Sequence, residues 1–314
     1  MKYATFLHDG EQRSGVVTDD GVHPFDVGVG LLGLIEAGES ELRAVGARAL
    51  TGAPRLALAE VRLLPPLQPP TVRDFMTFEG HVAGIAVGYG DTVPEEWYAK
   101  PAFYFTNPYA MIGAHDDVPV PPGCRRFDFE LEVAAVVGRA GRDLSPKEAQ
   151  DHIIGYTILN DWSARDLQGQ EMKVKLGPAK GKDSATTLGP WLVTADELDP
   201  YRNAEGFLDL ELTVDVNGVT IGQDTLANMA WTFEEMVAYA SRGTWVRPGD
   251  VLGSGTCGNG GCLAELWGRG GALEPPPLTY GDTVTITAQG LGTISNTVVE
   301  GVAPLPIASA RRRL

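Results

Sequence analysis

The chain has 314 residues, with 41 acidic against 25 basic side chains and a formal net charge of −16. This length is enough for one large domain or two smaller ones. The charge and the pI of about 4.7 argue against nucleic acid or an anionic membrane as a partner. With 43% hydrophobic residues and a mean hydropathy of −0.07, the composition is that of a soluble globular protein.

The N-terminus and the cysteines bear on where the protein works. The segment 1–6 lacks the apolar run of a signal peptide, and the sequence has no run of about 18 apolar residues that could span a membrane. Three cysteines are too few for a disulfide framework, and Cys257 and Cys262 match no common zinc spacing. We therefore expect a cytoplasmic protein with free thiols.

Residues 1–64 are expected to form a small N-terminal domain. The segments 3–7 and 15–18 flank an Asp-Gly turn, and Asp20-Gly21 offers a second turn, which together predict a β-meander. Apolar residues then recur at helical spacing between 31 and 50 and predict one or two amphipathic helices. Paired prolines at 65–66 and 69–70 mark the boundary of this domain.

Residues 70–314 are expected to form a second domain that is rich in strands. Thr232 and Glu235 have the spacing of a capping box, and the helix that they begin is expected to end at Gly243. Turn signals precede strand patterns at 251–252 and 283–287. The fold class predicted from these patterns is α+β, with a mixed, mostly antiparallel sheet structure and few helices.

The stretch 127–138 predicts a strand that carries two acidic residues. Because side chains alternate along a strand, Glu130 and Glu132 share one face, and the apolar residues between them share the other. Two carboxylates about 7 Å apart on a half-buried face repel each other unless a cation lies between them. The alternative is an ordinary solvated strand face.

A second apolar strand, 153–160, leads into Asp161. Ser163 and Asp166 have the spacing of a capping box, so a short helix is expected to begin there. A side chain at the point where a strand gives way to a helix is well placed for a functional role. A lone aspartate at such a position also serves as a turn or helix-start residue.

Six segments together resemble the fumarylacetoacetate hydrolase family, and the resemblance covers about residues 70–300. The segments are Asp128–Glu132, Asn160–Asp166, Leu176–Lys182, Pro190-Trp191, Arg247–Asp250 and Ser254–Thr256. The resemblance implies a β-roll or sandwich of the type found in the family's C-terminal domain. It also implies that Glu130, Glu132 and Asp161 hold Mg²⁺ or Ca²⁺, with Mn²⁺ as a third candidate. Oxygen ligands suit such hard cations.

Further matches resemble the subgroup that hydrolyses fumarylacetoacetate. Asp74 then corresponds to an additional metal ligand, His81 to the residue that activates water, and Glu265 to the carboxylate that orients it. A neutral histidine whose tautomer is fixed by a carboxylate can take a proton from water. A histidine in a loop can equally be a surface or structural residue.

The resemblance also assigns the residues that would contact a substrate. Lys182 corresponds to the active-site lysine, and an ammonium near a metal suits an anionic keto acid and a developing oxyanion. The remaining positions are Arg165, Gln168, Tyr104 and Thr256 as substrate contacts and Thr186 as a residue that supports the site. An exposed loop lysine and hydroxyls that cap turns are the structural alternatives.

Two departures from the family pattern concern the substrate. Met76 and Met172 stand where the fumarylacetoacetate-cleaving enzymes have tyrosines, so the pocket is expected to be more apolar and the substrate less polar. The Gly-rich, then acidic stretch 81–100 is expected to be either a lid or an ordinary surface loop.

The resemblance leads us to expect a hydrolase of C–C bonds in small 1,3-diketo acids, acting as a homodimer. One alternative is a decarboxylase, hydratase or isomerase of keto acids from the breakdown of aromatic compounds, on the same metal site. Another is a ligand-binding protein without catalytic activity on the same scaffold. The pairing of His81 with Glu265 favours hydrolysis.

Overall fold

The computed structural model describes residues 1–52 and 55–312. Residues 53–54 and 313–314, which fall within the two predicted domains, lie outside the described residues. Within the described ranges, no helix is long and apolar enough to cross a membrane.

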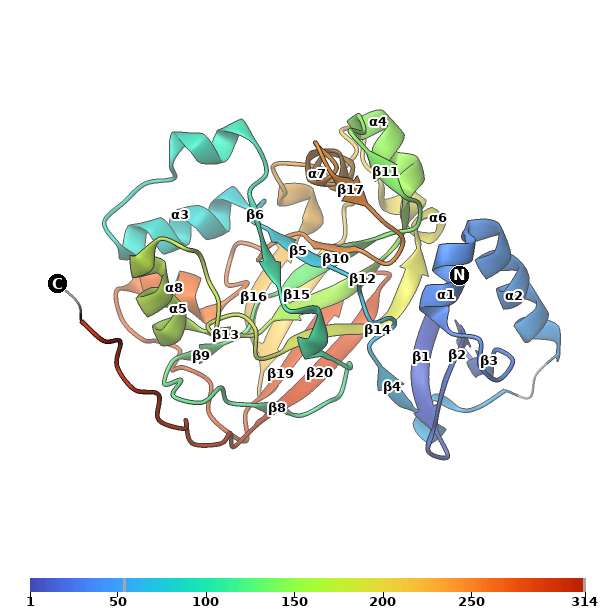
Figure 1. Cartoon of the computed structure of the whole chain (residues 1–314), viewed down its shortest axis with the longest axis horizontal. Coiled ribbons are helices and arrows are strands. Elements are labelled where there is room, and N and C mark those ends of the chain that lie inside the picture. Colours follow the sequence, from blue (N-terminus) through green and yellow to red (C-terminus); the bar gives the residue numbers. More distant parts are fainter. Residues whose placement is uncertain (53–54, 313–314) are drawn as a thin grey trace.

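The N-terminal segment forms the predicted meander and helices. Its elements are β1 (Lys2–His8), β2 (Glu11–Thr18), β3 (Gly21–Pro24), α1 (Leu31–Ala37) and α2 (Glu39–Gly52). Asp9 and Gly10 join β1 to β2 with φ angles of 51° and 80°, the left-handed conformation that a tight hairpin turn requires. Figure 1 shows α1 and α2 beside these strands.

A large sheet of eleven strands runs through both predicted domains. Its order is β3-β2-β1-β14-β12-β10-β18-β5-β6, with β4 paired to β1 and β7 paired to β14. The remaining strands of this sheet are β4 (Arg62–Leu64), β5 (Val72–Phe75), β6 (Phe103–Thr106), β7 (Met111–Ile112), β10 (Glu132–Val137), β12 (Ile153–Asp161), β14 (Thr186–Thr194) and β18 (Val251–Gly253). Because β1 pairs with β14, the sheet crosses the predicted boundary at residues 65–70.

A five-stranded sheet packs against the large one. Its order is β16 (Val219–Thr225), β15 (Glu211–Val216), β19 (Thr283–Ala288), β20 (Gly292–Val299) and β8 (Val118–Pro119). Two further pairs are β9 (Phe127–Asp128) with β13 (Ser163–Ala164), and β11 (Gly141–Arg142) with β17 (Trp245–Val246). Most pairings in the two sheets are antiparallel, so the predicted α+β class is confirmed.

The remaining helices are short and lie mainly outside the sheets (Figure 1). They are α3 (Glu79–Gly88), α4 (Pro146–Ala149), α5 (Arg165–Glu171), α6 (Ala195–Leu198), α7 (Phe233–Ala240) and α8 (Leu263–Gly270). The 3₁₀ turns are η1 (Leu58–Glu60), η2 (Glu95–Ala99), η3 (Pro108–Ala110), η4 (Gln150–His152), η5 (Met172–Val174), η6 (Asp199–Tyr201) and η7 (Leu226–Asn228).

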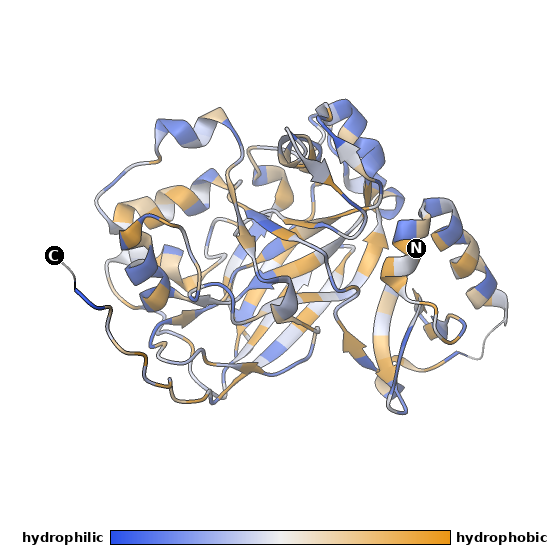
Figure 2. Cartoon of the chain, viewed as in Figure 1, coloured by the Kyte–Doolittle hydropathy of each residue, from blue (hydrophilic) through white to orange (hydrophobic). Residues whose placement is uncertain are grey.

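Alternate residues of strand β10 contribute to two different hydrophobic cores. Val133 and Val137 face the core between the two sheets, whereas Ala134 and Val136 face a second core that includes Leu42 of α2. The strand is therefore buried on both faces, as a continuous apolar run requires. Figure 2 shows the strands largely orange and peripheral helices such as α4 largely blue.

Three local expectations differ from the structure. The predicted strand 127–138 is interrupted between β9 and β10, because the backbone N–H of Glu130 donates to the side chain of Asn160 on β12 rather than to a backbone carbonyl. Helix α7 has the predicted capping box but ends at Ala240, before Gly243. Helix α5 begins without a side-chain cap, since the Ser163 hydroxyl donates instead to the Asp161 carbonyl.

The stretch 81–100 contains helix α3 and turn η2. Trp97 of η2 is buried, its indole N–H donates to the Met76 carbonyl at 2.8 Å, and its ring lies 4.8 Å from that of Trp231. The segment is therefore attached to the body of the protein through η2.

Candidate metal centre

The four predicted metal ligands lie on neighbouring parts of the large sheet. Asp74 belongs to β5, Glu132 begins β10, Asp161 ends β12, and Glu130 lies just before β10. All four are at most 4% exposed. Strand β18 separates β5 from β10 and places Gly253 directly beside Asp74.

Three of these carboxylates form one compact group. One oxygen from each of Asp74, Glu130 and Glu132 lies within 4.8 Å of the other two, the single acidic cluster of this kind among the described residues. Asp161 joins them through Lys182, whose ammonium lies 2.5 Å from Glu130 Oε2 and 3.0 Å from Asp161 Oδ2. Asp74, Glu130 and Glu132 thus surround one position, and Asp161 borders it through its contacts with Lys182 and Tyr104.

Two neighbours complete the contacts of this cluster. The Tyr104 hydroxyl lies between Asp74 Oδ2, at 2.7 Å, and Asp161 Oδ2, so that these two carboxylates share its one donor. An added Cβ on Gly253 would lie 2.7 Å from Asp74 Oδ1 and 3.0 Å from Glu132 Oε2. The glycine therefore leaves room for both carboxylates, and a larger residue would intrude between them.

The charges within the cluster are unevenly compensated. Burial, together with Asp161 and Glu130, raises the pKa of Asp74 to about 8. Burial and the adjacent Asp74 raise the pKa of Glu132 well above its usual range. Burial acts in the same direction on Glu130, but Lys182 and Arg165 overcome it and lower the pKa of Glu130 to about 2. Glu130 thus has cationic partners, whereas Asp74 and Glu132 repel each other.

A divalent cation fits this arrangement. Asp74 Oδ1 and Glu132 Oε1 are buried and have no hydrogen-bond partner in the part of the chain that the structure describes. Buried carboxylate oxygens need a hydrogen bond or a cation, and hard dications prefer oxygen ligands. The orphaned oxygens and the excess of negative charge are what such an ion would compensate.

Arg165, predicted to contact substrate, also holds the site in place. Its guanidinium lies 2.8 Å from Glu130 Oε1, and its Nε donates to Asp128 Oδ2 at 2.7 Å. Its Nη1 donates to Gln168 Oε1 at 3.2 Å, which keeps these two predicted substrate contacts together. Thr186 donates to Asp161 Oδ1 at 3.4 Å. Thr256 is buried next to Gly255, whose N–H donates to Glu132 Oε2.

Two supporting residues were not predicted from the sequence. Asp128 is fully buried and accepts hydrogen bonds from Arg165 and from the first two backbone N–H groups of α8. Asn160 fixes the backbone of Glu130 through its side-chain oxygen at 2.8 Å. Both lie in the segments that carried the family resemblance, and a polar residue next to each predicted ligand was the available signal.

His81 and Glu265 approach each other from two helices. His81 lies on α3 and Glu265 on α8, with Nδ1 and Oε2 3.8 Å apart. Both side chains are largely buried, and Cys262 Sγ also lies 3.8 Å from His81 Nδ1. His81 lies within electrostatic range of the cluster, since it adds to the effect of Lys182 and Arg165 against burial in lowering the pKa of Glu130. Such a separation is common before a substrate tightens a catalytic pair.

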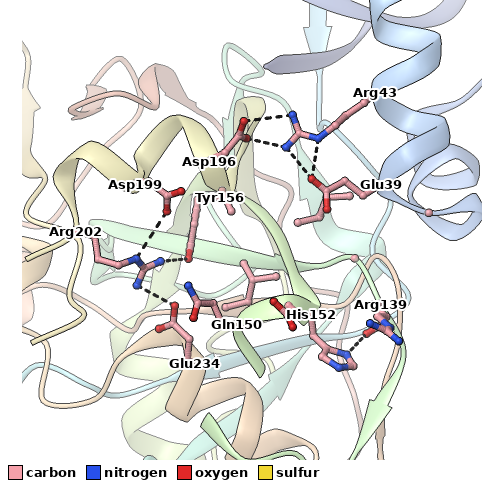
Figure 3. Close-up of a pocket in the computed structure, with 16 residues that line it drawn as sticks. Glu39, Arg43, Arg139, Gln150, His152, Tyr156, Asp196, Asp199, Arg202 and Glu234 are labelled. Atoms are coloured by element: carbon pink, nitrogen blue, oxygen red, sulfur yellow. Dashed lines mark hydrogen bonds and ion pairs between the residues drawn. The ribbon is translucent and has the colours of Figure 1, made fainter. Parts of the chain in front are cut away.

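A separate cavity of about 620 Å³ lies between α2 and the region around α6 (Figure 3). Arg43, Arg202 and several acidic residues line it, and its arginines pair with acids such as Asp196 and Glu234. Among the described residues that line it, there is no member of the predicted site. The carboxylate cluster is therefore distinct from this cavity.

By its fold and site, the chain is an α+β protein with a candidate divalent metal centre of buried carboxylates. Residues 71–299 match the family described as "Fumarylacetoacetate (FAA) hydrolase C-terminal", and residues 1–66 match the one described as "Rv2993c-like, N-terminal". The chain belongs to the fumarylacetoacetate hydrolase family.

Individual relatives agree with this assignment. Fumarylacetoacetase of Arabidopsis thaliana is 28% identical over 281 residues, which cover 74% of this chain and 66% of that protein. The structure of a fumarylacetoacetate hydrolase from Exiguobacterium antarcticum has a TM-score of 0.76 at 28% identity and covers 96% of this chain and 99% of that chain.

A more distant structure shares the fold. Maleylpyruvate hydrolase from Sphingobium sp. SYK-6, in complex with manganese(II) and pyruvate, has a TM-score of 0.72 at 22% identity and covers 96% of this chain and 100% of that chain. At this identity the likeness shows the fold alone.

Proposed function

We propose that this protein is a divalent-metal-dependent hydrolase that cleaves a C–C bond in 1,3-diketo acids such as acylpyruvates or fumarylacetoacetate-like compounds. The observation that carries the proposal is the His81–Glu265 pair, whose histidine acts electrostatically on Glu130 of the buried carboxylate cluster. The names of the Arabidopsis and Exiguobacterium relatives support the same reaction class.

Asp74, Glu130, Glu132 and Asp161 are the residues that would hold the ion. Their oxygen-only donor set suits Mg²⁺ or Ca²⁺, with Mn²⁺ as the third candidate. When bound, the ion supplies Lewis acidity toward the oxygens of a keto acid.

His81 is the proposed general base. Glu265 faces one ring nitrogen, which leaves the other to take a proton from water. The resulting hydroxide adds to a ketone carbon of the diketo acid and leaves an oxyanion. That oxyanion re-forms the C=O bond as the adjacent C–C bond breaks, with the electron pair left on the departing enolate. The proton held by His81 then returns to the enolate carbon, so that one water molecule is consumed and an acid and a ketone are released.

Lys182 and Arg165 are the proposed partners of substrate oxygens. An ammonium has three N–H donors, and in the described structure Glu130 and Asp161 take up two of those of Lys182. The third is proposed to stabilise the negative charge that develops on the substrate. Carboxylates on both sides raise the pKa of Lys182 above its usual value although burial opposes them, so the side chain stays cationic.

The expected substrate is less polar than fumarylacetoacetate. Met76 and Met172 are 41% and 50% exposed and offer thioether surface where the family's fumarylacetoacetate-cleaving members have phenols. A thioether does not replace a phenol as a hydrogen-bond donor. We therefore propose an acylpyruvate with an apolar tail as the preferred substrate.

Product analysis by mass spectrometry tests the reaction. The purified protein with Mg²⁺ or Mn²⁺ should convert acylpyruvates into two fragments, whereas release of CO₂ or formation of an isomer would contradict the hydrolase. His81→Asn should lower kcat by at least about 100-fold while metal binding is retained. The control is His8→Asn on β1, a strand that carries none of the predicted site residues, and it should keep full activity.

We also propose a cytoplasmic homodimer, on the basis of the family alone. Light scattering of the purified chain at working concentration should give twice the monomer mass of 33.5 kDa. A mass of one chain would contradict the dimer without affecting the proposed chemistry.

A further inference from the structure

The two helices that carry His81 and Glu265 cross at very close range. An added Cβ on Gly88 of α3 would lie 2.8 Å from the Cα of Gly268 on α8. An added Cβ on Gly84 would collide with the Glu265 side chain and lie 3.0 Å from Arg269 Nε. Because the backbones touch through glycines, a small shift of either helix changes the distance between His81 and Glu265.

Arg269 connects these two helices at the same point. Its Nη2 lies 2.7 Å from Glu265 Oε1 and donates to the Gly80 carbonyl at 3.1 Å. Gly80 directly precedes His81 in α3. One guanidinium nitrogen therefore contacts the proposed orienting carboxylate and the backbone next to the proposed base.

We infer that Arg269 is a positioning residue for the His81–Glu265 pair, an inference that rests on the proposed function. Glu265 is fully buried, with Oε1 2.7 Å from Arg269 Nη2 and Oε2 3.8 Å from His81 Nδ1. Among the described residues neither oxygen has a hydrogen bond, so these two charged contacts are what orient the carboxylate. A charge-assisted contact on one oxygen fixes the plane of the carboxylate and so the direction of the other oxygen. Arg269 acts through Glu265.

An ordinary helix-surface ion pair has a different environment. Arg48 and Glu41 on α2 lie 3.4 Å apart, with side chains 65% and 51% exposed. Such pairs contribute little to stability because water screens them. In the Arg269 pair the arginine is 44% exposed, but the acid is 0% exposed. A buried carboxylate that loses its cation keeps its desolvation cost, and its orientation is no longer fixed.

The test combines substitutions at both residues. Arg269→Met should lower kcat about tenfold with KM and metal affinity unchanged, because it impairs the base without touching substrate or metal. Arg269→Lys should restore part of kcat. In a Glu265→Gln background, Arg269→Met should cause no further loss, since both changes disable one pair. Arg48→Met is the matched control and should leave kcat unchanged.

Hydrogen exchange gives a second readout that does not need turnover. Loss of the Arg269 contact with Gly80 should increase deuterium uptake in residues 79–88, whereas Arg48→Met should not. A kcat of Arg269→Met within twofold of the unchanged enzyme, or losses that add fully to those of Glu265→Gln, would overturn the positioning role. Failure of the unchanged chain to cleave any diketo acid would instead overturn the proposed function.

Discussion

The distribution of charge around individual carboxylates divides the site into two parts. Glu130 has Arg165 and Lys182 within 2.8 Å, whereas Asp74 and Glu132 each leave a buried oxygen without a hydrogen-bond partner in the described chain. A buried acid without a partner is costly to the fold. The residues proposed to bind the metal are therefore expected to destabilise the protein when the metal is removed.

This cost predicts opposite effects of one substitution on stability and binding. Glu132→Gln removes an acid that burial and Asp74 push toward its protonated form, at a cost to folding, so the Tm of the metal-free protein should rise by about 2–4 °C, the shift that about 1 kcal/mol causes in a large domain. The same change should weaken Mn²⁺ binding more than about tenfold. Differential scanning fluorimetry with chelator and calorimetric titration with Mn²⁺ measure the two effects.

Glu36→Gln, an exposed change on α1, provides the control and should alter neither quantity. A lower Tm of metal-free Glu132→Gln, or an unchanged affinity for Mn²⁺, would show that Glu132 is a structural acid rather than a ligand.

Residue types, spacing and the family segments were enough to nominate the acids and the side chains that contact them, but not the residues that support the site from further out. Glu130, Glu132 and Asp161 follow from strand patterns and family segments, and the structure brings them together with Lys182 and Tyr104. The contact of Asp128 with Arg165 spans 37 residues of sequence. Glu265 and Arg269 have the i,i+4 spacing of a helix pair, but the contact of Arg269 with Gly80 spans 189 residues. No local pattern encodes such contacts, so they became visible only in the folded chain.

At the scale of elements, the crossing of α3 and α8 controls the proposed catalytic pair. Glycine inside a helix is less stable than alanine by about 1 kcal/mol. A glycine inside α3 therefore lowers stability unless close packing leaves no room for a side chain. Gly84 lies against Glu265, whereas the space around Gly80 is open apart from Gly258 Cα at 3.8 Å. Close packing therefore requires a glycine at position 84 but not at position 80.

This difference predicts contrasting results for two alanine substitutions. Gly84→Ala should lower both the unfolding free energy, by about 1–3 kcal/mol, and kcat, because the new methyl group displaces Glu265. Gly80→Ala should leave kcat near that of the unchanged enzyme and stability equal or slightly higher. Urea unfolding and steady-state kinetics measure the pair of variants, and equal effects of the two would refute close packing at Gly84.

Elements were predictable where local pattern and tertiary contacts agree. The capping box of Thr232 and Glu235 begins α7 as expected, because both hydrogen bonds are local. The strand through Glu130 and the cap at Ser163 were wrong, since Asn160 binds the Glu130 backbone and Ser163 bonds to the Asp161 carbonyl. These two departures lie beside the proposed ligands, where the backbone serves the site rather than regular structure.

At the scale of the whole molecule, one sheet and several ion pairs, from the N-terminal amine, Arg43 and Arg62, connect the N-terminal segment to the rest. Strand β1 pairs with β14, and Arg43 of α2 makes a two-pronged contact with Asp196 of α6, at 2.9 Å and 3.2 Å (Figure 3). The segment before the paired prolines is thus bound through backbone and side chains alike. Whether it is a separate domain stays a prediction.

The Arg43–Asp196 contact predicts a pH dependence of stability. The hydrogen bonds from Arg43 lower the pKa of Asp196 to about 2. An unfolded aspartate titrates near 3.9, so the contact should stabilise the fold fully above about pH 4 and lose its effect as the pH falls toward 2. Because both side chains are 36% or more exposed, its contribution should not exceed about 1 kcal/mol.

Urea unfolding of the unchanged protein and Asp196→Asn at several pH values tests this linkage. The difference in unfolding free energy should be greatest at pH 6 and shrink toward pH 3, as the unfolded chain gains a proton that the folded chain binds only weakly. Arg43→Met should reproduce the same profile, and the double variant should add nothing because both changes remove one contact. A difference that stays constant between pH 6 and pH 3 would show that Arg43 and Asp196 do not stabilise the junction as an ion pair.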